Sequence, residues 1–236
     1  MTVKLLTEED FEERKKLTEQ WFEVKLLSKG KHGYPEKLVC RPLKVKDLKP
    51  LIVTRIEDEV GYLKMLVAKI SDTVVEPKGF DLREVTIFDF FKVLLAHRVN
   101  SIGSFYDLRW VCDRCGKEGG QTFDLMQLEE KYISDEYPGD PVVLESGVKV
   151  RFPRVSALTR KGSGSLLDLT DMDLAEDAVV DGGFDELDLR RLKEVMDFIR
   201  KWYGSYGLQD RVRVKCKECG GEQEVVIPYL FFLFFW

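Results

Sequence analysis

The chain has 236 residues, of which 44% are apolar and 33% are charged, and its formal net charge is −5. This balance is typical of a folded, soluble protein of one or two domains and excludes a disordered one. The acidic net charge argues against broad binding to nucleic acid, which needs a basic surface. No apolar run reaches the roughly 20 residues of a membrane-spanning helix, so we expect no transmembrane segment.

We expect residues 1–104 to form a mainly helical N-terminal region. A capping signature at Thr7–Asp10 begins a charge-rich stretch, which predicts a first helix that fades near Gly30. Residues 37–43 alternate between apolar and polar side chains, so a short strand is expected there.

Two further helices are predicted before the first cysteine pair. Apolar residues recur every three or four positions over 48–70, which indicates one helical face. Thr86 and Asp89 fit a capping box, and the apolar spacing that follows predicts a helix from Ile87 that ends within 99–103.

Two Cys-x-x-Cys-Gly pairs are the most informative pattern in the chain. Each pair stands between two runs of strand-forming residues, so we expect two hairpins with a cysteine turn at each tip. The two-residue gap lets both sulfurs of a turn face one ion, and the following glycine can adopt a positive φ. Two such turns supply the four thiolates of a closed, structural zinc site. The predicted Zn²⁺ ligands are Cys112, Cys115, Cys216 and Cys219.

About a hundred residues separate the two pairs, whereas a zinc ribbon usually has roughly 15–20. We therefore expect a split ribbon, formed by 105–128 and 208–228, with an insertion over 129–207. Such an insertion costs little closure entropy, because that cost grows only logarithmically with loop length.

Disulfides and a redox dithiol are the alternatives to a zinc site. Disulfides belong to secreted proteins, and residues 1–7 do not resemble a secretory leader. A redox motif should precede a helix in a βαβ unit and would not need a second copy. A catalytic zinc ion keeps an open coordination position, which four thiolates do not leave.

The insertion is expected to contain four parts. Turn and strand residues predict a β-hairpin, glycine and serine predict a flexible loop, a run of acidic residues predicts an acidic loop, and apolar periodicity predicts a final helix. In chain order these parts are residues 141–153, 160–165, 168–188 and 189–202.

Other residues with possible chemistry favour structural interpretations. The acidic stretch lacks the glycine and glutamate of a calcium loop, so it is interpreted as a solvated face or a surface for a basic partner. A hydrolase that used it would need a second metal ion. Cys40 is expected in the core, and His32 and His97 are expected in structural roles. No catalytic residues are predicted.

Residues 229–236 form an aromatic C-terminal tail that is too short to span a membrane. If alternate residues folded back on the ribbon as a strand, the other side would still present large apolar groups. Exposed apolar patches of this size usually mark partner surfaces, and aromatic residues are favoured there. The expected partner-binding residues are Tyr229, Phe231, Leu233, Phe235 and Trp236.

The order of a capped helix, a cysteine turn, an insertion, a second cysteine turn and an aromatic ending resembles the baseplate hub assembly proteins of contractile-tailed bacteriophages. Residues 85–103, 110–116 and 215–220, with Phe231 and Phe232, carry the resemblance. It implies a non-enzymatic virion or assembly component of the zinc-ribbon type, either a hub subunit or a hub assembly factor, located at the virion tail baseplate and assembled in the host cytoplasm. The implied partners are other tail proteins, namely hub and tape-measure proteins.

We therefore expect an α+β fold, in which a helical N-terminal half is joined to a split four-Cys zinc ribbon with a β-hairpin and helix insertion. The alternative function is a zinc-ribbon nucleic-acid-binding accessory protein in transcription or replication. Basic residues around the second cysteine pair favour it, but neighbouring acidic residues cancel their charge, and no stacking platform for bases is evident. Binding to nucleic acid is therefore not expected.

Overall fold

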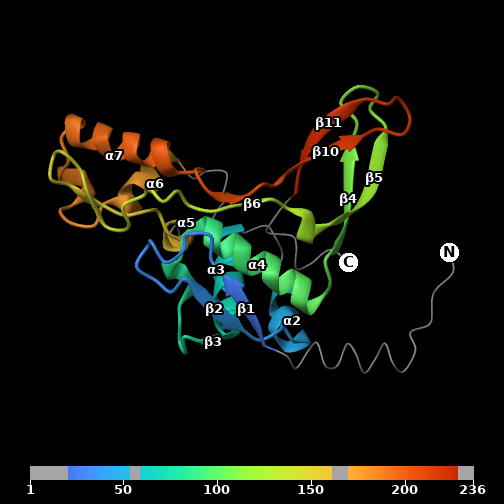
Figure 1. Cartoon of the computed structure of the whole chain (residues 1–236), viewed down its shortest axis with the longest axis horizontal. Coiled ribbons are helices and arrows are strands. Elements are labelled where there is room, and N and C mark those ends of the chain that lie inside the picture. Colours follow the sequence, from blue (N-terminus) through green and yellow to red (C-terminus); the bar gives the residue numbers. More distant parts are fainter. Residues whose placement is uncertain (1–20, 54–58, 161–169, 228–236) are drawn as a thin grey trace.

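Figure 1 shows a computed structural model of the chain, which describes residues 21–53, 59–160 and 170–227. The fold mixes helices with several small antiparallel sheets. A central body carries a helical lobe on one side, and a long ribbon of strands projects from the other side (Figure 1). No helix in the described ranges is both long and apolar enough to cross a membrane.

A three-stranded antiparallel sheet packs against helices in the central body. Its strands, in spatial order, are β1 (Phe22–Lys25), β2 (Lys37–Cys40) and β3 (Val74–Glu76). Inward-facing residues of the sheet share one core with the body helices. These helices are α2 (Val45–Val53), α3 (Glu59–Ser71) and α4 (Ile87–Ser101), with the short 3-10 helix η1 (Leu82–Glu84) before α4.

The prediction of a helix that continues to Gly30 is wrong for the described residues, because residues 22–25 form β1. Val24 is buried while Glu23 and Lys25 are exposed, which is the period of two that pairing with β2 requires. Positive φ values at Lys29 and Gly30 then produce a turn. The capping signature at residues 7–10 lies outside the described residues.

Helix α4 begins where the sequence predicts, since Thr86 is its N-cap and accepts a hydrogen bond from the Asp89 N–H at 3.4 Å. The reciprocal half of the capping box is absent. The Thr86 N–H donates to the Tyr34 hydroxyl instead, and the Asp89 carboxylate accepts from the Leu27 N–H at 2.6 Å. Burial raises the pKa of Asp89, although bonds from Ser28 and other donors lower it.

The insertion forms the helical lobe. It contains the predicted β-hairpin and final helix, but the acidic stretch is not a continuous loop, because Thr170 caps a short helix with a complete capping box. Asp177 in this helix is buried and accepts from the Arg154 N–H at 2.9 Å. The elements are β6 (Glu130–Lys131), β7 (Val142–Val143), β8 (Lys149–Val150), α5 (Val155–Arg160), α6 (Asp171–Ala178), η4 (Phe184–Glu186), α7 (Leu189–Trp202) and β9 (Gly207–Leu208).

A buried chain of hydrogen bonds joins the core of the lobe to the core of the body. Nδ1 of His32 lies 2.9 Å from the Asp140 carboxylate, and Nε2 lies 3.0 Å from the Tyr206 hydroxyl. That hydroxyl is in turn 2.6 Å from the Thr86 hydroxyl. His32 is fully buried and has a partner at each ring nitrogen, which agrees with the structural role expected from the sequence.

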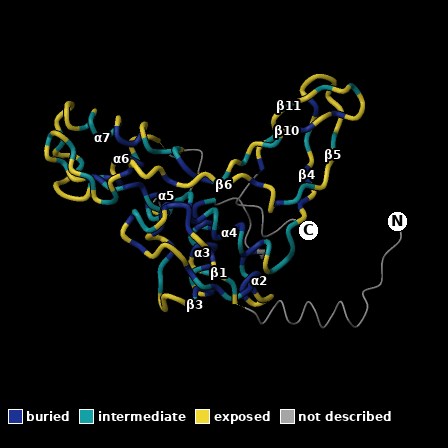
Figure 2. Tube along the Cα trace, in the orientation of Figure 1, coloured by how far each residue is buried: buried dark blue, intermediate teal, exposed yellow. Residues whose placement is uncertain are grey.

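The ribbon consists of two antiparallel hairpins that lie side by side (Figure 1). Their inward-facing side chains form a third core, which reaches α4 through Leu95. The tips of the hairpins are largely exposed (Figure 2). The ribbon elements are β4 (Phe105–Val111), β5 (Glu118–Asp124), η2 (Leu125–Gln127), β10 (Arg211–Lys215) and β11 (Glu222–Val226).

Candidate metal centre

Each hairpin of the ribbon ends in a cysteine turn, and the two turns have nearly the same backbone hydrogen bonds. The Cys112 N–H donates to the Lys117 carbonyl at 2.8 Å, and the Gly116 N–H donates to the Cys112 carbonyl at 2.8 Å. In the second turn, the Cys216 N–H donates to the Gly221 carbonyl at 2.8 Å, and the Gly220 N–H donates to the Cys216 carbonyl at 2.9 Å.

The glycine after each pair is required by the backbone. Gly116 has φ 68° and Gly220 has φ 67°, both in the left-handed region that side chains with a Cβ rarely adopt. Positive φ at this position turns the chain back toward the returning strand. The two turns therefore have matching shapes as well as matching sequences.

The structure brings all four predicted ligands together. The Sγ atoms of Cys112 and Cys219 are 3.6 Å apart, and those of Cys115 and Cys216 are 3.7 Å apart. All four Sγ atoms lie within 4.8 Å of one another. A disulfide has an S–S distance of about 2.05 Å, whereas tetrahedral zinc with bonds of about 2.3 Å sets its sulfur ligands about 3.8 Å apart. The four cysteines could hold a metal ion in this geometry.

The surroundings of the Cys112 sulfur favour a thiolate, whereas those of Cys115 do not. Backbone N–H groups of Cys115 and Arg114 hydrogen-bond to the Cys112 sulfur and lower the pKa of that thiol to about 7. At Cys115, the Lys117 N–H also lowers the pKa, but desolvation and the other ligand sulfurs raise it to about 12. Several sulfurs so close together cannot all ionise readily without a cation, and a bound cation would remove this repulsion.

Two residues that the sequence analysis did not single out support the cysteine turns. The side-chain amide of Gln223 bonds to the backbone on both sides of Cys112: it accepts from the Asp113 N–H at 2.9 Å and donates to the Val111 carbonyl at 3.0 Å. A Cβ at Gly221 would lie 3.2 Å from the Cys219 sulfur, so glycine at this position leaves room for that sulfur. The one sequence signal that could have identified Gln223 is its position, because it is a polar residue on the inward-facing side of a strand beside a cysteine turn.

The remaining cysteine and the second histidine are structural, as the sequence predicts. Cys40 is buried in the body core, and burial raises the pKa of its thiol to about 12. His97 is fully buried, and its Nε2 lies 3.0 Å from the Thr73 hydroxyl. Within residues 21–53, 59–160 and 170–227, Cys112, Cys115, Cys216 and Cys219 are the only group of three or more His, Cys, Asp or Glu side chains arranged so that they could share an ion.

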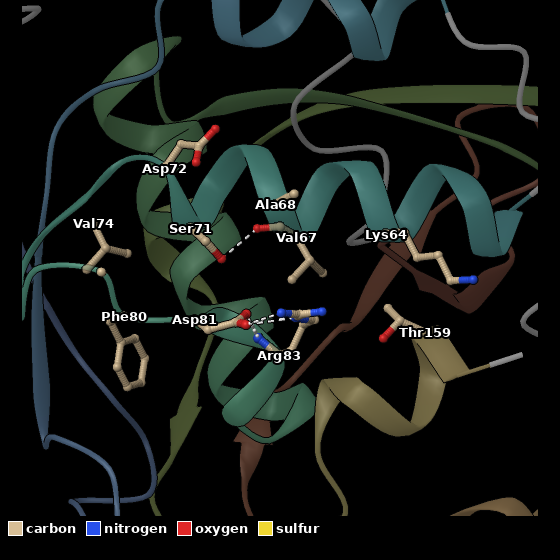
Figure 3. Close-up of a pocket in the computed structure, with 11 residues that line it drawn as sticks. Lys64, Val67, Ala68, Ser71, Asp72, Val74, Phe80, Asp81, Arg83 and Thr159 are labelled. Atoms are coloured by element: carbon tan, nitrogen blue, oxygen red, sulfur yellow. Dashed lines mark hydrogen bonds and ion pairs between the residues drawn. The ribbon is translucent and has the colours of Figure 1, made fainter.

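A pocket of about 710 Å³ lies between α3, η1 and α5 (Figure 3). Arg83 and Asp81 on its wall pair with each other at 2.6 Å. The Ser71 hydroxyl donates to the Val67 carbonyl of its own helix at 2.8 Å. Its lining residues include no histidine or cysteine.

Comparison with known proteins places the whole arrangement in a family. The model of a family described as T4 bacteriophage base plate protein matches residues 19–233. No curated protein and no solved structure gave a match. The match confirms the baseplate part of the resemblance seen in the sequence. Since it spans well over half of the chain, the chain belongs to the T4 bacteriophage base plate protein family.

Proposed function

We propose that this baseplate component is a non-enzymatic subunit or assembly factor of the baseplate hub that acts by binding other tail proteins. The family match over residues 19–233 carries this proposal, because it includes the body, the lobe and the ribbon together. The projecting ribbon supports a binding role, since it extends from the body and exposes the tips of both hairpins (Figure 2).

We propose Zn²⁺ as the ion at the candidate metal centre, with Cys112, Cys115, Cys216 and Cys219 as its ligands. Four thiolates fill a tetrahedral zinc ion and leave no position for substrate, so the role would be structural. Two short hairpins bury few apolar groups of their own. Zinc sites of this kind contribute roughly 10–16 kcal/mol of apparent binding free energy, which would fasten the hairpins together.

The proposed partners are the hub and tape-measure proteins of the same phage, met during assembly in the host cytoplasm. The proposed partner-binding residues of the aromatic tail lie outside the described residues. They are Tyr229, Phe231, Leu233, Phe235 and Trp236. The support for this role remains the aromatic composition of the tail.

Analysis of the metal content of the purified full chain tests the zinc proposal. We expect one zinc ion per chain, lost in Cys112→Ser and in Cys216→Ser because each variant removes one of the four ligands. Cys40→Ser is the matched control and should keep the ion, since Cys40 lies in the body core. Metal-free wild-type protein, purified without chelators, would rule out the site.

Co-expression with the individual tail proteins of the same phage tests the hub proposal separately. We expect the hub or tape-measure protein to co-purify with the chain, and the double variant Phe231→Ser, Phe235→Ser to weaken this association. Val143→Ser, at an exposed apolar residue of the lobe, is the control. Stable association only with proteins from other parts of the tail would contradict a hub position.

A gel-shift series over increasing salt examines the nucleic-acid alternative, because binding to phosphates weakens steeply with salt. On the exposed face of the second hairpin, Arg213 pairs with Glu224 at 3.8 Å and Lys215 stands opposite Glu222. These neighbours offset the basic charge, so we expect no salt-dependent shift.

A further inference from the structure

Among the residues that the structure describes, the central sheet has an open edge at β1. Its strand order is β1-β2-β3, so β1 bonds to one neighbouring strand. The Leu26 N–H donates to the Glu36 carbonyl at 2.8 Å, so Leu26 and Glu36 are a hydrogen-bonded pair of the β1–β2 ladder. Because bonded pairs alternate along an antiparallel ladder, the backbone N–H and C=O groups of Glu23 and Lys25 point away from β2. The edge therefore presents two donors and two acceptors.

A groove runs beside this edge, along α4. It comprises two adjoining hollows of about 260 and 250 Å³, and Glu23, Lys92, Ala96 and Glu130 line both of them. Elements η2 and β6 provide the opposite wall. We call this feature the β1–α4 groove. Its apolar lining consists of Val24, Leu95, Ala96, Val99, Leu125, Met126 and Leu128.

The dimensions of the groove suit a short extended peptide. The lining residues of α4 run from Lys92 to Asn100, which is about 12 Å along a helix axis. Four residues of a β-strand span about 13 Å, and β1 itself has four residues. Just beyond Lys25, the Ile133 N–H donates to the Leu27 carbonyl at 3.0 Å, so another part of the chain borders that end.

Most of the charged side chains on the rim of the groove are paired, and Lys25 is the exception among the described residues. Glu23 pairs with Lys37 at 2.7 Å, and Lys92 pairs with Glu130. Among the residues that the structure describes, no ion-pair partner lies within 4.0 Å of the Lys25 ammonium group. A ligand with a carboxylate near Lys25 would complement this charge.

We propose that the β1–α4 groove binds an extended segment of a partner protein, which adds a strand to the open edge of β1. The segment would set small apolar side chains against α4 and a carboxylate near Lys25. An open edge alone does not indicate a binding site, because short edges with charged side chains are common. A groove that adjoins the edge, charged beside β1 and apolar farther along α4 and η2, is the second, independent feature.

The probe is an acetylated and amidated pentapeptide of alternating valine and aspartate, titrated into the full-length, isotope-labelled chain and followed by NMR. We expect shifts at the amides of Glu23, Lys25 and Ala96, and slower amide exchange at Glu23 and Lys25. The same peptide with N-methylated backbone amides is the control, since it keeps the side chains but cannot pair as a strand.

Two variants separate the edge from the groove. Lys25→Pro removes an outward-pointing N–H without removing a β1–β2 bond, and Ala96→Phe fills the hollow from α4. Each should weaken peptide binding about tenfold, which corresponds to about 1.4 kcal/mol. Lys25→Thr keeps the N–H and should retain the strand-pairing signals, and an unchanged spectrum elsewhere verifies the fold of each variant.

Absence of binding, or equal binding of the N-methylated peptide, would overturn the proposal. Self-association of the chain that Lys25→Pro abolishes would also overturn it, because the occupant would then be a second copy. These outcomes depend neither on bound metal nor on hub membership, so they test the groove alone.

Discussion

Asp113 and Gln223 are 110 residues apart in the chain, yet the Asp113 N–H donates to Oε1 of Gln223 at 2.9 Å. With its second bond to the Val111 carbonyl, this one side chain holds the first cysteine turn against the second hairpin. None of the three residues in this contact is a proposed ligand of the metal ion. The two hairpins thus have a polar link besides the four cysteines and the apolar core between them.

Replacing Gln223 by alanine should remove this link. Since a net hydrogen bond is worth about 1 kcal/mol and the side chain is half-buried, we expect the ribbon to lose about 1–2 kcal/mol of stability. Release of zinc to a chelator should also become faster. Gln121→Ala, at an exposed position of β5, is the matched control. Equal release rates in both variants would show that the Gln223 bonds do not stabilise the centre.

Gly119 allows the indole ring of Trp110 to lie across the neighbouring strand. A Cβ at Gly119 would lie 2.5 Å from Cε2 of Trp110, closer than carbon atoms can approach. Gly119→Ala should therefore destabilise the ribbon by about 1–3 kcal/mol, the usual range for overpacking. At Gly120 the nearest atom to a Cβ would be 3.9 Å away, so Gly120→Ala should cost clearly less. Chemical denaturation, followed by tryptophan fluorescence, compares the two.

The fully buried His97 should make folding sensitive to acid. Desolvation, with a smaller contribution from Arg41, lowers the pKa of His97 from 6.5 to about 3. Between these values the unfolded chain takes up a proton that the folded protein does not. Stability is therefore complete above pH 6.5 and falls by about 1.4 kcal/mol per unit as the pH decreases toward 3.

His97→Gln keeps a donor for Thr73 but has no titrating group. Its stability should depend less on pH between 6.5 and 4 than that of the wild type, measured by denaturant titration at several pH values. Loss of metal in acid affects both proteins alike, so the difference between them isolates His97. Parallel pH profiles for the two proteins would contradict the assignment.

Thiol counting distinguishes Cys40 from the proposed ligands. The Cys40 thiol is fully buried in the body core, where a reagent cannot reach it, whereas Cys115 is exposed. We expect little reaction of the zinc-loaded protein with a thiol reagent, four reactive thiols after chelation, and five after denaturation. Cys40→Ala should give four under both of the last two conditions. Rapid reaction of all five thiols in the chelated, folded wild type would contradict the burial of Cys40.

Local signals in the sequence predicted the elements that depend on local interactions. Helix α4 follows from its N-cap and apolar spacing, α7 follows from its amphipathic pattern, and the two cysteine turns follow from a repeated pentapeptide. The convergence of the two turns was predictable because zinc needs four ligands. The same reasoning gave the ligand set of the candidate site.

Elements that depend on distant partners were not predictable in this way. Strand β1 is short and lies in a charge-rich stretch, so the helical signal upstream of it outweighed an alternation of only four residues. The role of Asp89 depends on backbone groups of residues 27 and 28, about 60 positions away. The role of Gln223 could likewise not be predicted, because its two hydrogen bonds exist only when the two hairpins lie side by side.

The ligand cysteines bracket the whole insertion, since one pair precedes it and the other follows it. Once an ion is bound, a single break in the backbone anywhere between Cys115 and Cys216 would leave both fragments tethered at the ion. A nicked molecule would then migrate as one particle in a native gel and separate on denaturation. Proteolytic damage within the lobe would thus leave the two hairpins fastened to each other.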